Sequence, residues 1–301
     1  MKERNIVKLI KEIASDCNIN IYLYSDDWVI ELEKNNKRTF VHGYTFECNS
    51  PSVNLILKDK NALYEILNRN GIDAVQHFYF YKDIDLNNGS ISRMDKYLKN
   101  YNKLVIKDNV GTGGNDVYLV NDKKSMYNVA KDLYTRCGEF SISPYYEIEH
   151  EYRAIVQNGV IKVLYEKIRP FVIGDGKSSV VELKNFKYGE NFKIKAKLNE
   201  NYVPLNNEYV LLNWKHNLGQ GATPKIVSNT QIIIAIENIV NKVVNLLKIE
   251  LASIDIISVN NEYKILEING GIMMEKFAES NKENYEIAKL IYKNAIISHL
   301  S

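Results

Sequence analysis

Cysteine is scarce in this sequence, and its few copies are not arranged for pairing or for binding a metal. Cys17, Cys48 and Cys137 are odd in number, lie far apart and form no Cys-x-x-Cys or Cys/His spacing. A disulfide framework and a zinc site of the usual spacing are therefore not expected. Free cysteines are typical of proteins kept in a reducing compartment, so we predict a cytoplasmic location.

The sequence also lacks an excess of charge and a long uninterrupted apolar run. Its 39 basic and 37 acidic residues nearly cancel, which gives no electrostatic reason to expect a nucleic acid or an anionic membrane as a partner. The apolar stretch 232–247 is interrupted by Glu237 and Lys242, and the first residues lack the apolar core of a secretory signal. We expect no membrane span and a small, locally charged substrate.

Apolar residues are abundant, by contrast, and they follow both helical and strand periods. They make up 45% of the 301 residues, which is enough for one large domain or two to three packed subdomains. Periodicity and cap residues predict helices at 6–13, 60–68, 92–101, 125–137, 230–247 and 282–299, and strands at 19–24, 28–32, 39–41, 75–80, 103–107, 117–120, 151–157 and 160–167. Asn158-Gly159 is the strongest short hairpin signal.

Three oxygen-bearing side chains near the end of the chain form a candidate metal site. In an extended strand Glu267 and Asn269 point to one face, while Leu266 and Ile268 point to the other. A hairpin turn at Asn260-Asn261 brings Asp255 onto the same face if its loop holds three residues, whereas a two-residue loop reverses the parity. Two carboxylates and an amide suit Mg²⁺, which usually also binds substrate phosphates. An acidic strand end in a solvated hairpin is the alternative interpretation.

A glycine-rich turn follows the predicted strand 103–107. Lys107 lies at the strand end, and Gly111-Thr112-Gly113-Gly114 follows it. Glycines allow backbone N–H groups to approach an anion, Thr112 adds a hydroxyl donor, and Lys107 adds a positive charge. The pattern indicates a phosphate-binding loop, although such a turn alone is often only a turn.

A second glycine segment, Gly174-Asp175-Gly176-Lys177-Ser178, resembles the end of a P-loop but does not match the full P-loop motif. The required glycine five positions before Gly176 is replaced by Phe171. We therefore interpret the segment as a tight turn before a short helix.

Taken in order, these motifs resemble the ATP-grasp superfamily of carboxylate–amine ligases over most of the chain. Asp59-Lys60 before a helix ending at Gly71-Ile72 resembles the entry lysine of that family, and Lys107 matches the lysine at the base of its glycine loop. The segment 143–153, ending in Glu151-Tyr152-Arg153, resembles the hinge between its lobes and the strand that follows.

The resemblance is closest to the ATP-grasp halves of cyanophycin synthetase and of bifunctional glutathione synthetase. The segments that occur in the same order are Arg153, Arg169-Pro170, Gly174–Ser178 and Asn217–Gly221. The sequence departs from the family pattern after Asn269, where Gly270-Gly271-Ile272-Met273-Met274 replaces an alanine- or proline-containing segment.

This resemblance implies an α+β fold with two lobes gripping ATP. The implied domains are an N-terminal α/β domain at 1–57, a small lobe with the glycine loop at 58–145 and a C-terminal lobe with the metal site at 146–301. The implied cofactors are ATP and Mg²⁺, as one or two ions, with Mn²⁺ as a further possibility.

The resemblance also implies roles for individual residues. The nucleotide would be held by Lys60, Lys107, Gly111, Thr112, Gly113, Gly114, the hinge residues Tyr145, Tyr146 and Glu147, and Leu266 under the adenine. The metal ligands would be Asp255, Glu267 and Asn269. Arg153 and Arg169 would bind carboxylate or phosphoryl oxygens, and Lys215 and Asn217 would contact the transferred phosphoryl group. Arg153 and Arg169 could instead be structural ion-pair partners, and no histidine is assigned a catalytic role.

The implied activity is the joining of a carboxylate to an amine through an acyl phosphate, with a homo-oligomer as a possible assembly. The partners would be a small carboxylate and a small amine. Three alternatives stay open at this point: a ligase that modifies a peptide or protein, a nucleotide-regulated binding module without catalysis, and a kinase-like enzyme that stops before amine transfer.

Overall fold

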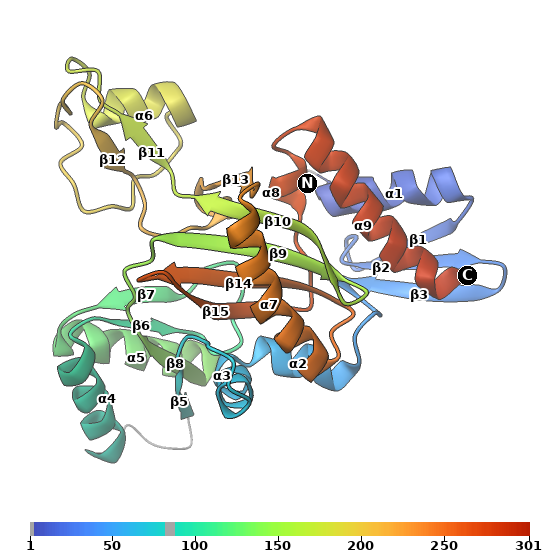
Figure 1. The fold of residues 1–301 in the computed structure, drawn as a ribbon, viewed down its shortest axis with the longest axis horizontal. Helices are drawn as coiled ribbons and strands as arrows, with labels where there is room; N and C mark the ends of the chain where they lie inside the picture. Colours follow the sequence, from blue (N-terminus) through green and yellow to red (C-terminus); the bar gives the residue numbers. More distant parts are fainter. Residues whose placement is uncertain (1–2, 82–87) are drawn as a thin grey trace.

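The computed structural model describes residues 3–81 and 88–301, and Figure 1 shows its arrangement. A central five-stranded sheet lies between three smaller parts of the molecule. An N-terminal unit lies on one side of the central sheet, a small lobe lies on the opposite side, and a short two-stranded unit protrudes from the sheet (Figure 1). The mixture of helices and sheets agrees with the predicted α+β class.

The N-terminal unit is a four-stranded antiparallel sheet covered by two helices from opposite ends of the chain. Its strands are β1 (Asn20–Tyr24), β2 (Val29–Lys34), β3 (Lys37–His42) and β4 (Thr45–Phe46), in that order. Helix α1 (Asn5–Cys17) buries Ile6, Leu9, Ile10 and Ile13, which fall at helical spacing. The last helix, α9 (Lys282–Leu300), packs into the same core.

The small lobe has its own sheet and its own core. Its strands are β5 (Phe78–Tyr81), β6 (Leu104–Lys107), β7 (Val117–Val120) and β8 (Glu139–Pro144), in the order β5-β8-β6-β7. Helices α4 (Asn88–Tyr101) and α5 (Lys123–Cys137) belong to this lobe. Asp122 caps α5, and Gly138 ends it in the left-handed region with φ 80°, as the sequence pattern predicts.

The five-stranded sheet has the order β13-β10-β9-β14-β15. Its strands are β9 (His150–Gln157), β10 (Val160–Ile168), β13 (Thr223–Ile226), β14 (Leu251–Val259) and β15 (Glu262–Asn269). One face packs against α2 (Pro51–Lys58), α3 (Lys60–Arg69) and α7 (Thr230–Leu247). The other face meets the N-terminal unit and α8 (Glu275–Ala278).

The apolar clusters do not follow the domain limits implied by the resemblance. Leu63 and Leu67 of α3, which lie in the expected small lobe, pack with the five-stranded sheet. The expected strand 75–80 is shorter in the structure, because β5 begins only at Phe78, and Ala74, just before the expected range, forms an isolated parallel bridge to Ile265 of β15. The limits 1–57, 58–145 and 146–301 stay a prediction.

Helix α7 is the one helix in residues 3–81 and 88–301 that could cross a membrane by length and composition, with a mean hydropathy of 1.2. One such helix is weak evidence for a span, because core helices meet the same criterion. Ile236, Val240, Val243 and Leu247 are buried in the cluster shared with the five-stranded sheet.

The protruding unit contains β11 (Phe171–Ile173), α6 (Val180–Tyr188) and β12 (Tyr209–Leu211). Before α6, the Asp175 carboxylate accepts hydrogen bonds from the backbone N–H groups of Lys177 (2.9 Å) and Ser178 (2.7 Å). Ser179 and Glu182 then form a capping box at the start of the helix. The glycine segment 174–178 is therefore a turn before a short helix, as predicted, and not a P-loop. The segment that leads back to the sheet contains the short 3-10 helix η1 (Leu218–Gln220).

Both central hairpins combine a two-residue loop with a β-bulge. The β9–β10 loop is Asn158-Gly159, with φ of 54° and 76°, and the β14–β15 loop is Asn260-Asn261, with φ of 51° and 63°. Each ladder then shifts its register by one residue, at Lys162 in β10 and at Leu266 in β15. The expectation that Asp255 faces Glu267 only across a three-residue loop is wrong, because the bulge at Leu266 restores the parity.

Candidate active site

A cavity of about 660 Å³ lies between the small lobe, the five-stranded sheet and the N-terminal unit. It brings together 15 of the 17 site residues expected from the sequence. These are Lys60, Lys107, Gly111, Thr112, Gly113, Gly114, Tyr145, Tyr146, Arg153, Lys215, Asn217, Asp255, Leu266, Glu267 and Asn269. Arg169 and Glu147 do not line it. The Glu147 side chain is 78% exposed and pairs with Lys103 at 3.3 Å.

A row of polar side chains crosses four strands beneath this cavity, and all of its members except the fully buried Tyr165 line it. Tyr165 of β10, Arg153 of β9, Asp255 of β14 and Glu267 of β15 are successive cross-strand partners. Directly opposed residues in an antiparallel sheet share one face, so this register alone places the four side chains side by side. Asp255 is only 1% exposed.

Asp255 is enclosed by two cations. Arg153 donates from Nε to Oδ1 and from Nη2 to Oδ2, both at 2.7 Å, and Lys167 Nζ donates to Oδ2 at 2.8 Å. Burial alone would raise the pKa of Asp255, but Arg153 and Lys167 hold it well below the ordinary value. Asp255 is therefore a fixed anion, and Arg153 is an ion-pair partner in this structure.

Lys167 and Glu151 belong to the same cluster, and the sequence analysis assigned neither of them a role. Lys167 Nζ donates to Glu151 Oε1 at 2.6 Å, and both residues are buried. Burial raises the pKa of the Glu151 carboxyl, while Lys167 opposes that shift. The sequence could have indicated Glu151 as a site residue, because it lies two residues from Arg153 and therefore on the same face of the strand. The sequence could not have indicated Lys167, because the bulge at Lys162 is needed to bring Lys167 to Glu151.

Lys107 is a buried cation with an open side toward the cavity. It is 6% exposed, and within the part of the chain that the structure describes its ammonium has no hydrogen bond or ion pair. The pKa of Lys107 is lowered to about 8, chiefly by burial and in addition by the neighbouring Lys60, while Glu267 opposes the shift. An unpaired buried ammonium lacks compensation for its lost hydration, so this position favours an anionic ligand.

The charges around the cavity leave an excess of cations. Among the residues that line it, seven lysine and arginine side chains face five carboxylates. The cations are Lys58, Lys60, Lys107, Arg153, Lys167, Lys215 and Lys276, and the carboxylates are Asp108, Glu151, Asp255, Glu267 and Glu275. A cavity with this balance attracts anions.

The glycine loop is held from both sides through its carbonyl groups. Lys60 Nζ donates to the carbonyls of Asn109 (3.1 Å) and Gly111 (2.6 Å). On the opposite side, Lys215 Nζ donates to the Gly114 carbonyl at 3.1 Å, and Asn217 Nδ2 donates to the Gly113 carbonyl at 2.9 Å.

Lys60, Lys215 and Asn217 thus bind the loop in this structure, and their expected phosphate contacts stay a prediction. Gly114 has φ 70°, and a Cβ there would lie 2.4 Å from Asn217 Nδ2. Glycine is therefore required at this position for the loop to approach Asn217.

The oxygen donors fit a hard divalent cation that brings further ligands with it. Glu267 and Asn269 are half-buried neighbours, and Asn269 Nδ2 donates to Glu267 Oε1 at 3.3 Å. Both oxygens of Asp255 are already engaged by Arg153 and Lys167. In residues 3–81 and 88–301 no group of three His, Cys, Asp or Glu side chains could hold a metal alone. The donor set suits Mg²⁺ that also binds phosphate oxygens.

The hinge between the lobes also lines the cavity through Tyr145 and Tyr146. The Tyr145 backbone N–H donates to the Lys103 carbonyl at 3.1 Å, and the Tyr145 ring lies 6.2 Å from the Trp214 ring. Leu266 also lines the cavity, although simple alternation with Glu267 predicts the opposite face. The bulge at Leu266 explains this difference.

His77, His150 and His216 do not form an acid–base pair with one another. His216 lines the cavity and donates from Nδ1 to the Lys167 carbonyl at 2.8 Å, and burial lowers its pKa to about 4. His77 is 4% exposed, and neither ring nitrogen has a hydrogen-bond partner among the described residues. His150 is exposed and pairs with Glu166.

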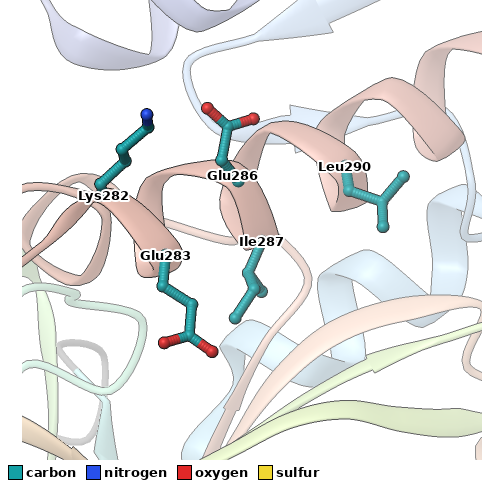
Figure 2. A pocket seen from close by; sticks show the side chains of 5 residues that line it. All are labelled: Lys282, Glu283, Glu286, Ile287 and Leu290. Carbon is teal, nitrogen blue, oxygen red and sulfur yellow. The ribbon is translucent and has the colours of Figure 1, made fainter.

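A second hollow lies along α9, away from these groups (Figure 2). Its five lining residues are Lys282, Glu283, Glu286, Ile287 and Leu290, and all come from this one helix. It has no set of polar side chains that converge from several elements, so we place the candidate site in the larger cavity.

Solved structures with the same architecture agree with this interpretation of the fold. A bifunctional glutathione synthetase from Pasteurella multocida matches with a TM-score of 0.58 and 15% identity, over 95% of this chain and 44% of that one. A D-alanine–D-alanine ligase from Bacillus anthracis complexed with ATP matches with a TM-score of 0.53 and 15% identity, over 81% and 65%. The ATP-grasp ligase PsnB, complexed with a precursor variant, Mg and ADP, matches with a TM-score of 0.50 and 9% identity, over 82% and 62%.

These similarities establish the class of fold. The chain has the ATP-grasp fold, as the sequence motifs predict. It spans between 44% and 65% of the length of these three proteins. No protein-family model and no curated protein sequence matches it.

Proposed function

We propose that this protein is an ATP-dependent carboxylate–amine ligase that forms an amide bond and releases ADP and phosphate. The observation that supports it most is the cavity itself. An unpaired buried Lys107, the Glu267–Asn269 oxygen pair and the Arg153–Asp255 ion pair face one another below a glycine loop. The names of the structurally similar glutathione synthetase and D-alanine–D-alanine ligase denote reactions of this kind, which favours the proposal.

The reaction has two steps. A substrate carboxylate oxygen attacks the γ-phosphorus of ATP, and the bond to the β-phosphate oxygen breaks to release ADP. The nitrogen of an amine then attacks the acyl carbon, phosphate leaves with the bonding electrons, and the nitrogen loses a proton. Formation of the acyl phosphate makes the carboxylate reactive at the expense of ATP.

The side chains of the cavity would mainly position and neutralise the reacting groups. Lys107 and Lys60 would neutralise the phosphates, and the loop 111–114, including Thr112, would cover them and exclude water. The adenine would lie at the hinge of Tyr145, Tyr146 and Glu147, above Leu266.

The remaining cations would act on the transferred group. Arg153 would bind a carboxylate or phosphoryl oxygen through its planar guanidinium, as would Arg169 if it moves into the site. Lys215 and Asn217 would give up their hydrogen bonds to the carbonyls of the glycine loop and bind the transferred phosphoryl group instead.

One or two Mg²⁺ ions, with Mn²⁺ as a substitute, would be held by Glu267, Asn269 and Asp255. Such an ion stabilises the negative charge that develops on phosphate oxygens. Asp255 would contribute through a lone pair not used by Arg153 and Lys167, or after one of these cations shifts toward the phosphates.

The direct test measures ADP and phosphate release from ATP–Mg²⁺ against pools of amino acids, dicarboxylates and short peptides. We expect release that requires one acid and one amine, with a product of the condensed mass. A phosphorylated acid formed without an amine would instead indicate a kinase-like activity. ATP binding without release from any pool would favour a nucleotide-regulated binding module.

A second candidate is a ligase that acts on a peptide. The protruding unit carries apolar side chains that nothing in the described structure covers, with Phe186 94% and Leu205 73% exposed. Such side chains suit a polypeptide better than a small molecule. PsnB, whose structure contains a precursor, is an ATP-grasp ligase of comparable fold. Release stimulated only by peptides would favour this candidate.

The cytoplasmic location and the homo-oligomer also stay proposals.

Nucleotide binding should weaken as the pH rises through the pKa of Lys107, which is about 8. The ammonium form binds phosphate, and it is nearly complete at pH 7 and mostly lost at pH 9. We expect the Kd for a non-hydrolysable ATP analogue with Mg²⁺ to rise about tenfold between these values. Isothermal titration calorimetry at pH 7, 8 and 9 measures it.

The matched variants are Lys107→Arg and Lys58→Arg. Arginine keeps its charge at pH 9, so Lys107→Arg should lose the pH dependence, whereas the exposed Lys58 should not affect it. The same slope in all three proteins would assign the titration to another group.

A further inference from the structure

The N-terminal unit contributes a fixed aromatic surface to the cavity. Trp28 lines the cavity and is 44% exposed. The Arg4 guanidinium carbon lies 4.5 Å from the centre of its ring, and the edges of His42 and Tyr44 approach it, each with ring centres 6.3 Å away. Gly43 has φ 60°, and a Cβ there would lie 3.0 Å from Trp28 Cζ2. The indole is therefore closely framed, yet much of it stays open.

This aromatic surface is tied to the strand that carries Glu267 and Asn269. Thr45, which follows Tyr44, bridges to Gly271, two residues after Asn269. A Cβ at Gly270 would lie 2.2 Å from Asn54 Oδ1, so this glycine permits the close packing. Trp28 and the oxygen donors thus belong to one rigid wall of the cavity.

The groups around Trp28 are apolar or cationic. Met273 is 45% exposed and lines the cavity two residues after Gly271, and Lys58 and Lys276 are among the other cations that line this cavity. Glu275 is already engaged, because it accepts hydrogen bonds from the Tyr44 hydroxyl at 2.9 Å and the Ile6 N–H at 3.3 Å. A second cation on the indole would be repelled by Arg4 and these lysines.

We propose that Trp28 determines substrate specificity, and that the carboxylate substrate carries a flat aromatic group that stacks on the indole. The inference rests on the proposed ligase function. A carboxylate matches the cationic surroundings, and an aromatic group covers the exposed indole better than an aliphatic one. Bound in this way, the substrate carboxyl extends toward Glu267 and Asn269, where the phosphoryl group would be transferred.

The sequence provides a direct reporter for this inference. It has two tryptophans, Trp28 and Trp214, and both line the cavity, Trp214 beside the hinge residue Tyr145. Trp214→Phe leaves Trp28 as the single tryptophan, and Trp28→Phe leaves Trp214. Fluorescence therefore reports on the surroundings of Trp28 and of Trp214 separately.

The experiment titrates each single-tryptophan protein with L-phenylalanine and 3-phenylpropionate, and with L-alanine and L-glutamate as aliphatic comparisons. A non-hydrolysable ATP analogue with Mg²⁺ is present throughout. We expect a saturable change of Trp28 emission with the aromatic carboxylates only, and no comparable change of Trp214. In calorimetry, Trp28→Leu should weaken their binding about tenfold. Phe40→Leu, at an exposed aromatic residue of the same unit that does not line the cavity, should have no effect.

Equal responses to aromatic and aliphatic carboxylates, or no response of Trp28, would overturn the inference. ADP release is measured separately with the wild-type protein. Release stimulated only by aliphatic acids supports the ligase function and overturns the role of Trp28. A Trp28 response without any release supports the aromatic subsite and contradicts the ligase function.

Discussion

Glu267→Gln is expected to lower ATP turnover about 100- to 1000-fold without loss of the fold. The substitution keeps the size of the side chain and removes the charge that would bind the metal. Glutamine retains an oxygen that can accept the hydrogen bond from Asn269 Nδ2. Turnover is measured as ADP release at saturating ATP–Mg²⁺ with the best acid and amine, and the fold is monitored by thermal unfolding.

A matched control for this variant lies on the same strand. The Glu262 side chain is 74% exposed and does not line the cavity, so Glu262→Gln should leave turnover unchanged. Similar turnover in both variants would remove Glu267 from the reaction. A lower melting temperature of Glu267→Gln alone would show that its carboxylate serves the fold.

Asp255→Ala is expected to destabilise the protein by about 3–5 kcal/mol. The substitution leaves the Arg153 guanidinium without its anion and leaves Lys167 with Glu151 alone, so the desolvation cost of the guanidinium lacks compensation. Urea denaturation followed by tryptophan fluorescence measures the change in the free energy of unfolding. Asp132→Ala, which removes an exposed partner of Arg136 on α5, should have a much smaller effect.

A double substitution tests the cause of this loss. Arg153→Met in the Asp255→Ala background removes the guanidinium that lost its partner and leaves an unbranched apolar side chain, while the Lys167–Glu151 pair stays intact. It should recover part of the lost stability. If the double variant is less stable than Asp255→Ala, the loss arises from packing around Asp255 and not from the unpaired guanidinium.

Local signals predicted the helices and turns well where the capping residue and the spacing of apolar residues indicated the same element. Asp59 caps α3, α7 spans the predicted 230–247, and Asn158-Gly159 forms the expected turn. Helix α2 was missed, although Ser50 caps it and Pro51 occupies its first turn, which is a recognisable start signal.

The geometry of the site depends on features that cannot be recognised in the sequence. A β-bulge leaves no clear mark in residue types, and the bulges at Lys162 and Leu266 decide which side chains face the cavity. The contacts of Lys215 and Asn217 with the glycine loop join residues about a hundred positions apart. The motifs therefore predicted residues that line one cavity, whereas the pairing of its charges came from the tertiary structure.

The way in which the N-terminal unit completes its core also affects how the protein folds during synthesis. Its core is completed by Ile291, Tyr292, Ala295 and Ile296 of α9, and the Phe46 ring stacks on Tyr292 with centres 5.4 Å apart. During translation this unit leaves the ribosome long before α9 does. Its core is therefore completed only after the residues of the two intervening lobes have been synthesised, and until then the apolar side of α1 lacks the helix that covers it.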